Sequence, residues 1–348
     1  MKLEEPSFPK LILVTGGCGF IGSNFIKYLF SLDDHPKIVN IDKLTYAGNL
    51  ENLVEVNDNS NYYFVKGDIC DYELVSDTFD KFQPSMVVNF AAESHVDRSI
   101  NNPQVFFDTN VKGTLNLLEI SLHQNIDRFL QVSTDEVYGS LGKDGFFTEK
   151  TPISPNSPYS ASKASADNFV RAYNKTYGLD TIITRCSNNY GPYQFPEKLI
   201  PLMINNCKNN EPLPIYGDGL NVRDWIHVLD HCKGIWSSLL KGRKGEIYNF
   251  GGGCELTNIE IVRKVVKLLD CDESLITFVE DRQGHDFRYA IDFNKAKKEL
   301  AWRPLTMFDE GISETVNWYI NNENWLSSII SGDYKKYYQT TYSNIMKN

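Results

Sequence analysis

The sequence predicts an α/β protein: a doubly wound parallel sheet followed by a smaller C-terminal lobe. Over the first ~190 residues, short apolar runs rich in β-branched residues alternate with amphipathic segments of helical length. A cluster of glycines directly follows the first apolar run, where a sheet of this type turns into its first helix. After residue 188 the alternation gives way to loops rich in Gly, Pro and Asn.

Six apolar runs are expected to form the parallel strands, because strands buried on both faces are apolar throughout. The segments between them carry apolar residues at helical spacing and predict helices that cover the sheet. The predicted strands are 11–16, 37–42, 62–68, 86–92, 128–134 and 181–188, and the predicted helices are 20–32, 72–82, 103–123 and 158–177.

The rest of the chain predicts a smaller lobe with helices near 228–240, 258–269 and 310–321. We expect residues 1–188 to form the large domain and residues 189–330 to form mainly the small lobe, with the chain returning to the large sheet around 215–250. Residues 331–348 are a polar, Tyr-rich tail for which the sequence indicates no function.

Composition excludes several classes of protein. The 348 residues carry 35 Lys and Arg against 45 Asp and Glu, and a formal charge of −10 argues against a nucleic-acid partner. Seven scattered cysteines without a Cys-x-x-Cys pair argue against a disulfide framework and a metal site. The polar N-terminus and the absence of an apolar run near ~18 residues predict a cytoplasmic protein without membrane contact.

The glycine cluster has the spacing of a dinucleotide-binding turn. Gly16, Gly19 and Gly22 surround the start of the first predicted helix, and the missing side chains let backbone amides approach a pyrophosphate. Asp42 ends the second predicted strand, 20 residues past Gly22. A carboxylate there accepts hydrogen bonds from a ribose diol and repels a 2′-phosphate, which favours NAD over NADP.

The ends of neighbouring strands complete the expected cofactor site. Asp68 and Ile69 follow the third strand where an adenine would lie, and Ala91 and Ala92 leave room after the fourth. Helix capping by Asp68 and plain packing of the alanines explain these residues equally well when each is taken alone. Phe20, Ile21 and Lys43 complete the set, and Lys43 slightly weakens the exclusion of a phosphate.

Two further motifs predict acid–base chemistry. The fifth strand ends in Thr134, Asp135 and Glu136, at the edge of the sheet where ligands bind. Tyr159 and Lys163 are four residues apart on one helical face. A neighbouring ammonium and a positively charged nicotinamide would both favour the phenolate, so Tyr159 could take a proton from a carbinol. Taken singly, an exposed helix face and a surface turn explain these motifs as well.

Taken in order, these motifs resemble the extended short-chain dehydrogenase/reductases, and among them the nucleotide-diphosphate-glucose 4,6-dehydratases. The matching segments include VTGGCGFIGSNF, NFAAESHVDRSI, VSTDEVYG, PYSASKA, RCSNNYGPYQFPEKLIPL, RDWIHVLDH and DRQGHDFRYAID. The Asp135–Glu136 pair is the most specific match, since the related epimerases usually carry small residues there. The resemblance implies a Rossmann-type domain with a tightly bound NAD, and Tyr159 and Lys163 beside it.

The resemblance also implies the reaction. C4 of a glucose nucleotide is oxidised, water is eliminated across C5 and C6, and the hydride returns to C6. Elimination needs one acid and one base, which we assign to Asp135 and Glu136, respectively, in different protonation states. Thr134 is expected to form a hydrogen bond with the C4 oxygen. The alternatives are a UDP-sugar epimerase or decarboxylase of the same fold, and a non-catalytic NAD-binding protein.

By the same resemblance the nucleotide sugar binds largely in the small lobe. The implied contacts are Ser94, Asp97, Thr134, Asn188, Asn189, Glu197, Lys198, Leu199, Pro214, Tyr216, Arg223, Asn258, Arg282 and His285. Arg223 and Arg282 suit phosphate oxygens, although ion pairs with Asp224 or Asp286 are alternatives, as is core packing for His285. The sequence leaves dTDP-glucose and UDP-glucose open, because a methyl contact discriminates by only ~1–3 kcal/mol.

Two long predicted helices are expected to carry an interface between subunits. The segments 103–123 and 158–177 are long and apolar enough to pack against a symmetry-related copy. The resemblance implies that two helices from each subunit form a four-helix interface, and hence a homodimer with twofold symmetry.

Overall fold

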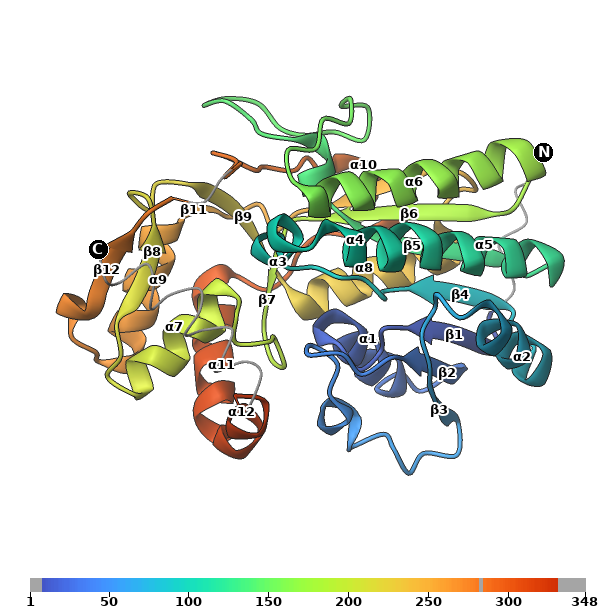
Figure 1. Cartoon of the computed structure of the whole chain (residues 1–348), viewed down its shortest axis with the longest axis horizontal. Helices are drawn as coiled ribbons and strands as arrows, with labels where there is room; N and C mark the ends of the chain where they lie inside the picture. Colours follow the sequence, from blue (N-terminus) through green and yellow to red (C-terminus); the bar gives the residue numbers. More distant parts are fainter. Residues whose placement is uncertain (1–7, 282–283, 331–348) are drawn as a thin grey trace.

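The computed structural model describes residues 8–281 and 284–330. A parallel sheet of seven strands forms its centre, in the order β10-β6-β5-β4-β1-β2-β3 (Figure 1). The strands are β1 (Leu11–Thr15), β2 (Lys37–Asp42), β3 (Tyr62–Lys66), β4 (Met86–Asn89), β5 (Arg128–Thr134), β6 (Thr181–Cys186) and β10 (Ile247–Phe250). The predicted α/β fold class is confirmed, and β1, β3, β4 and β6 end one to three residues earlier than predicted because the residues that follow, such as Gly16, Gly67 and Phe90, belong to the turns and loops at the sheet edge.

Helices cover both faces of this sheet. On one face α1 (Phe20–Phe30) packs beside α8 (Val228–Lys241), over strand residues such as Ile12 and Val14. On the other face α2 (Tyr72–Phe82), α5 (Thr114–His123) and α6 (Pro158–Tyr177) cover the intervening residues, among them Leu13. The side chains of consecutive strand residues therefore pack on opposite faces of the sheet, and both faces are covered by helices. This is why the strands are apolar throughout.

The predicted helix 103–123 is in fact three elements. α4 (Pro103–Phe106) leads into a π-helical segment, η2 (Phe107–Gly113), and then into α5. Within η2, the Asn110 side chain accepts from Glu93 N at 2.9 Å and donates to Glu93 O at 3.0 Å and Ser162 Oγ at 2.8 Å. These long-range bonds fix the loop after β4 against α6, and apolar periodicity alone does not report such a distortion.

The small lobe lies to one side of the central sheet (Figure 1). Its strands form a three-stranded sheet in the order β11-β9-β7 and a pair of β12 with β8. These elements are β7 (Asn188–Tyr190), β8 (Leu213–Tyr216), β9 (Val222–His227), β11 (Glu255–Thr257) and β12 (Ile276–Val279), with α7 (Leu199–Lys208), α9 (Asn258–Leu269), α11 (Phe308–Asn321) and α12 (Glu323–Ile329). Between β9 and β11 the chain supplies α8 and β10 to the large sheet, and α10 (Asn294–Leu300) packs on both.

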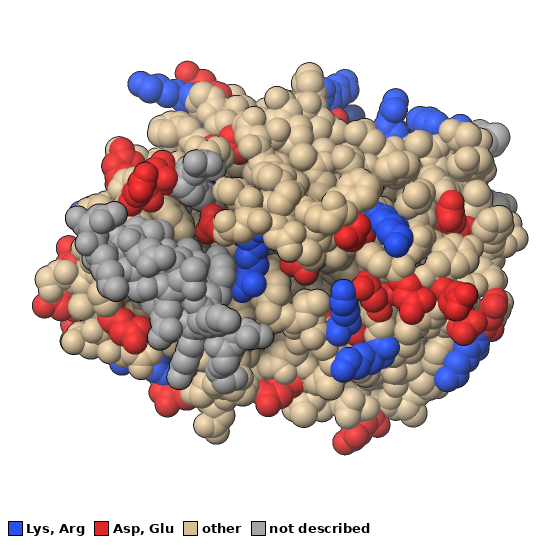
Figure 2. Space-filling model, in the orientation of Figure 1, with Lys and Arg blue, Asp and Glu red and all other residues tan. Residues whose placement is uncertain are grey.

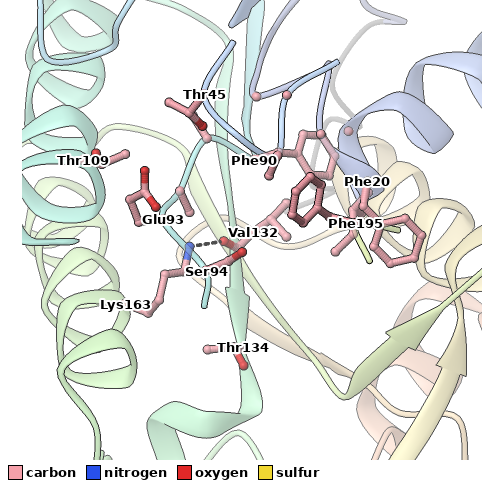
Figure 3. Close-up of a pocket in the computed structure, with 18 of the residues that line it drawn as sticks. Phe20, Thr45, Phe90, Glu93, Ser94, Thr109, Val132, Thr134, Lys163 and Phe195 are labelled. Atoms are coloured by element: carbon pink, nitrogen blue, oxygen red, sulfur yellow. Dashed lines mark hydrogen bonds between the residues drawn. The ribbon is translucent and has the colours of Figure 1, made fainter. Parts of the chain in front are cut away.

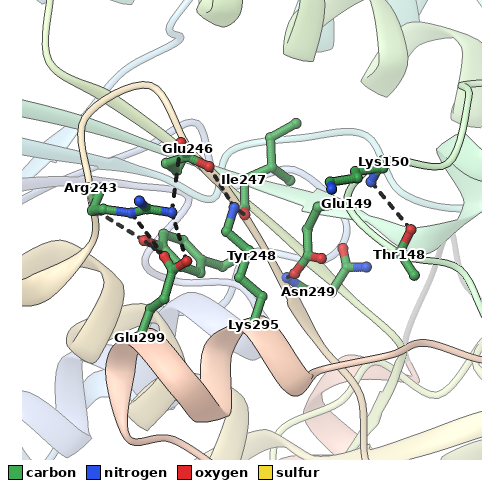
Figure 4. Close-up of polar contacts among 10 residues, drawn as sticks. All are labelled: Thr148, Glu149, Lys150, Arg243, Glu246, Ile247, Tyr248, Asn249, Lys295 and Glu299. Atoms are coloured by element: carbon green, nitrogen blue, oxygen red, sulfur yellow. Dashed lines mark hydrogen bonds and ion pairs between the residues drawn. The ribbon is translucent and has the colours of Figure 1, made fainter.

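Side chains cover the edge strand β10 (Figure 4). Lys295 Nζ donates to Ile247 O at 2.5 Å, and Glu149 Oε1 accepts from Asn249 N at 3.0 Å. Asn249 Oδ1 also accepts from the Tyr138 hydroxyl at 2.8 Å. Backbone groups that could recruit another strand are thereby occupied, and Tyr138 ties the turn after β5 to this edge.

The surface carries charge of both signs. Figure 2 shows Lys and Arg side chains interspersed with Asp and Glu on the face in view. Within 8–281 and 284–330, no helix combines the length and the apolar character that crossing a membrane requires.

Candidate active site

A pocket of about 300 Å³ opens at the carboxyl edge of the central sheet (Figure 3). Most of the predicted site residues line it. They are Gly16, Gly19, Phe20, Ile21, Gly22, Asp42, Lys43, Asp68, Ile69, Ala91, Ala92, Ser94, Thr134, Asp135, Glu136, Tyr159, Lys163, Asn188, Asn189, Glu197 and Lys198. The parallel arrangement explains the convergence, because the carboxyl ends of all these strands meet at one edge.

The glycine turn has no space for side chains. Gly16 has φ +68°, and a Cβ there would lie 2.6 Å from Ala91 N. A Cβ on Gly22 would lie 2.4 Å from Gly16 O. Gly19 is the N-cap of α1 and leaves the first amides of the helix without a side-chain cap. Gly19, Phe20 and Ile21 line the pocket, so these amides are available to an anion such as a pyrophosphate.

The part of the pocket beside β2 and β3 contains two carboxyl groups, those of Asp42 and Asp68. Asp42 accepts from Cys18 N and from Leu44 N, each at 2.8 Å. Burial raises the pKa of Asp42, while these two amides act in the opposite direction. The Lys43 ammonium lies 2.7 Å from Asp68, so its charge is neutralised within the site. This wall suits the neutral ribose diol of NAD better than a 2′-phosphate.

The turn after β5 presents two carboxyl groups of different character. Thr134 caps the short helix η3 (Asp135–Tyr138): its hydroxyl accepts from Glu136 N at 3.2 Å and donates to Asp135 Oδ1 at 3.3 Å. Asp135 is buried, and its Oδ2 has no hydrogen-bond partner among the described residues. Burial, and then the charges of Glu136 and Asp224, raise the pKa of Asp135 well above its usual range. Asp135 is therefore suited to donate a proton.

The Tyr159–Lys163 pair lies on the first turns of α6. Pro158 and a capping box between Ser157 and Ser160 start this helix directly before Tyr159. Lys163 Nζ donates to Val132 O at 2.7 Å, the bond that is dashed in Figure 3. Burial and the charge of Glu136 raise the pKa of Tyr159, and burial lowers that of Lys163. Burial therefore opposes the phenolate form of Tyr159, so the expected effect depends on the neighbouring ammonium and a bound nicotinamide acting together.

Seven of the expected substrate contacts lie outside this pocket's lining, namely Asp97, Leu199, Pro214, Tyr216, Arg223, Asn258 and His285. Several of them contact each other across the two lobes. The Tyr216 hydroxyl donates to Asp97 Oδ2 at 3.2 Å, the Tyr216 and His285 rings meet edge to face, and His285 Nδ1 lies 2.6 Å from Asp281 Oδ1. Arg282 lies outside the described residues.

Arg223 is buried rather than exposed to the pocket. Its guanidinium donates to Val222 O at 2.8 Å, Asp286 O at 2.9 Å and Phe287 O at 3.3 Å, and it lies 4.4 Å from the Tyr289 ring centroid. Asp224, the alternative partner considered for Arg223, accepts from Gly252 N at 3.1 Å and Cys254 N at 2.9 Å. The carbonyl contacts fix the segment around 286–287 against β9.

Sequence reasoning missed other pocket residues, among them Thr45, Phe90, Glu93, Thr109 and Phe195. Figure 3 shows Thr109 coming from η2 toward the pocket that Glu93 and Ser94 also line. Glu93 and Phe195 lie inside the matched segments NFAAESHVDRSI and NNYGPYQFPEKL, so neighbours of known positions could have been added. Thr109 has no such signal, because the π-helical segment that brings it to the pocket is invisible in the periodicity.

Known proteins share this architecture over nearly the whole chain. A family model described as GDP-mannose 4,6 dehydratase matches residues 13–315. A dTDP-glucose 4,6-dehydratase of Xanthomonas campestris is 53% identical over 341 residues, with 93% of this chain and 97% of the relative covered.

Solved structures match this chain over a similar length. A dTDP-glucose 4,6-dehydratase of Bacillus anthracis in complex with NAD has 54% identity and a TM-score of 0.86, covering 92% of this chain and 99% of its own. One from Streptomyces venezuelae, with NAD and TDP bound, has 49% identity and a TM-score of 0.89 at coverages of 92% and 99%. Fold and pocket define an extended short-chain dehydrogenase/reductase. Within that class, the chain belongs to the sugar-nucleotide 4,6-dehydratases of the dTDP-glucose 4,6-dehydratase type.

A methyl group on Gly22 is expected to abolish retention of NAD. In Gly22→Ala the new Cβ would overlap Gly16 O, so the turn that receives the pyrophosphate must move. Gly142→Ala is the matched control, since nothing lies within 4 Å of a Cβ there. NAD released from each denatured protein measures the effect, and a Gly22→Ala protein that carries as much NAD as the wild type would contradict the assignment.

Asp135→Asn is expected to stabilise the protein increasingly as the pH rises. Because folding raises the pKa of Asp135, the wild type loses stability as the pH climbs from about 4 toward the raised value, whereas Asn does not titrate. The variant's advantage in melting temperature should thus be larger near pH 8 than near pH 5. The exposed loop substitution Asp144→Asn serves as the control. An advantage independent of pH would refute a buried, protonated Asp135.

Proposed function

We propose that this chain is an NAD-dependent hydro-lyase that converts dTDP-glucose into the 4-keto-6-deoxyglucose nucleotide and water. The observation that carries the proposal is the buried Asp135 beside Glu136, in one pocket with Tyr159 and Lys163. An epimerase of the same fold has no use for an acid at Asp135. The relatives at about half identity, all named dTDP-glucose 4,6-dehydratases, support the nucleotide chosen.

The first group of residues handles the C4 oxygen. Tyr159 takes the proton of the C4 hydroxyl, and Thr134 holds the same oxygen by a hydrogen bond. Lys163, anchored on Val132 O, supplies positive charge next to Tyr159. The glycine turn and Asp42 would hold NAD, which when bound would supply the acceptor for the C4 hydride and its donor to C6. Phosphate and ribose contacts on this chain hold that cofactor throughout the cycle.

The second group of residues removes water. Once C4 is a ketone, the C5 proton is acidic, and Glu136 takes it while Asp135 donates a proton to the departing C6 hydroxyl. Glu136 later returns its proton to C5. At that point, compared with the start of the cycle, Tyr159 carries one additional proton and Asp135 lacks one. The Thr134 hydroxyl donates to Asp135 Oδ1 at 3.3 Å and lies close to Tyr159, so it is the route that we propose for the return of this proton.

The sugar nucleotide spans the pocket and the small lobe in this proposal. Ser94, Asn188, Asn189, Glu197 and Lys198 line the pocket and would contact the sugar. Lys198 Nζ already bridges the lobes by donating to Ser94 O at 3.0 Å. The diphosphate and base would then extend toward the small-lobe set, Leu199, Pro214, Tyr216, Arg223, Asn258, Arg282 and His285.

The active form proposed is a homodimer in the cytoplasm. Large apolar side chains stay exposed along α4, η2 and α6, namely Val105, Phe107, Phe169 and Tyr177. Such a surface on two adjacent helical elements favours a four-helix interface with a second copy. The seven cysteines are all unpaired, as expected in a reducing compartment.

The central test is product formation. Purified protein without added cofactor, incubated with dTDP-glucose, should yield a nucleotide sugar lighter by one water in mass spectrometry. UDP-glucose should react more slowly, since the nucleotide assignment predicts a preference for dTDP. Dehydration of neither sugar, even with added NAD, would overturn the proposal, and faster reaction of UDP-glucose would reverse the choice of nucleotide.

Glu136→Gln and Tyr159→Phe should stop the reaction at different steps. Glu136→Gln cannot take the C5 proton, so turnover should fall about 10²–10⁴-fold while oxidation at C4 still proceeds. Absorbance of reduced nicotinamide should therefore rise when dTDP-glucose is added. Tyr159→Phe cannot receive the C4 hydroxyl proton, and no such rise is expected. Normal turnover of Glu136→Gln would remove it as the base.

The mass in solution tests the dimer. Light scattering coupled to gel filtration should give about twice the chain mass of 39.8 kDa. Replacing Phe107 and Phe169 by Glu should shift the protein toward the monomer, because two charges would be buried at the interface. A wild-type mass of one chain would exclude the proposed dimer.

A further inference from the structure

The helix α12, the last described helix of the small lobe, reaches the large domain. Trp325 Nε1 donates to Asn52 Oδ1 at 2.7 Å, although 273 residues separate the two. Asn52 belongs to the short helix η1 (Leu50–Leu53), in the loop that follows β2. Both side chains are buried, with Asn52 1% and Trp325 7% exposed, so water does not compete for this bond.

The same Asn52 side chain holds the glycine turn. Asn52 Nδ2 donates to Cys18 O at 2.8 Å, and Asn49 N donates to the same oxygen at 3.0 Å. The backbone amide of Cys18 is held as well, because Cys18 N donates to Asp42 Oδ2 at 2.8 Å. Cys18 lies in the glycine turn, between Gly16 and Gly22. Both its backbone N–H and its backbone carbonyl are therefore hydrogen-bonded to residues outside the turn.

The Trp325 bond determines which way the Asn52 amide points. The indole N–H is a donor only, so it selects the oxygen of the amide and leaves the NH₂ group directed at Cys18 O. Without the bond from Trp325, the buried Asn52 Oδ1 loses its partner, and the preference of the Asn52 amide for one orientation over the flipped one weakens. A turn built largely of glycine has few side chains of its own to impose its shape, which makes such outside contacts decisive.

Aromatic packing places Trp325 at this point. Its ring lies 5.0 Å from Trp318 and 5.7 Å from Tyr193, centroid to centroid. Lys27 of α1 lies 3.9 Å from the centroid of the Tyr193 ring. α12 is thereby docked between the small lobe and the first helix of the large domain.

We propose that Trp325 and Asn52 are positioning residues for the NAD-binding turn, through which the helix α12 of the small lobe controls how long NAD stays bound. This inference rests on the proposed function only in so far as NAD is the ligand of the turn. A dehydratase whose cofactor is regenerated in each cycle gains from slow release, because loss of the cofactor in mid-cycle would strand the oxidised sugar.

The test is the rate at which bound NAD exchanges with labelled NAD in solution. Trp325→Phe keeps an aromatic ring and deletes the donor, and exchange should become about 3–10-fold faster, as expected for one lost hydrogen bond. Trp318→Phe is the matched control, since it shortens a ring of the same cluster and leaves the Trp325–Asn52 bond intact. Its exchange should stay within about twofold of the wild type.

A second variant keeps the test decisive if Trp325→Phe folds poorly. Asn52→Asp still accepts from Trp325 but cannot donate to Cys18 O, so exchange should accelerate by about 10-fold or more. The double variant should exchange no faster than Asn52→Asp alone, because both changes act on one chain of bonds. Melting temperatures with saturating NAD report general destabilisation separately.

Each outcome has a distinct meaning. If the wild type binds no NAD, the proposed function fails and not merely this inference. If the wild type binds NAD and Trp325→Phe exchanges it at the rate of Trp318→Phe, the inference is overturned. Effects of Trp325→Phe and Asn52→Asp that multiply in the double variant would also overturn it, because the two residues would then act independently.

Discussion

The parallel direction of the central strands is the constraint on which this site depends. Because β1, β2, β4, β5 and β6 all end at one edge, groups from Gly16 to Ser187 meet in one pocket without any long loop to bring them together. Each of these strands contributes residues at or just past its end. The chemistry is therefore distributed over the chain while the backbone that carries it is rigid.

Burial gives these groups their chemical properties. Thr134, Asp135 and Glu136 are consecutive, yet Asp135 is buried among other carboxylates and Glu136 is more exposed at the pocket wall. One polypeptide turn thus presents two neighbouring carboxyl groups in different surroundings, as the proposed acid and base require. The same surroundings raise the pKa of Tyr159 and make the anchor of Lys163 on Val132 O important, since an unpaired ammonium would be costly there.

The two lobes are joined by specific polar contacts. Lys198 bridges to Ser94, Tyr216 bonds to Asp97, and Trp325 reaches Asn52 behind the glycine turn. The small lobe therefore contributes to the cofactor side of the pocket as well as to the substrate side. Such contacts couple the halves of a reaction in which oxidation and elimination must occur without release of either ligand.

The sequence by itself determined the features that depend on residues close together in the chain. Strand and helix positions, the glycine spacing, Asp42 at a strand end and the Tyr159–Lys163 interval follow from short-range geometry, and most of the predicted cofactor and catalytic residues meet in the pocket. Only the tertiary structure decided what depends on packing. It places Thr109 in the pocket through a π-helical segment, buries Arg223 among carbonyls and raises the pKa of Asp135. These outcomes depend on which distant groups surround a side chain, and no period in the sequence encodes that.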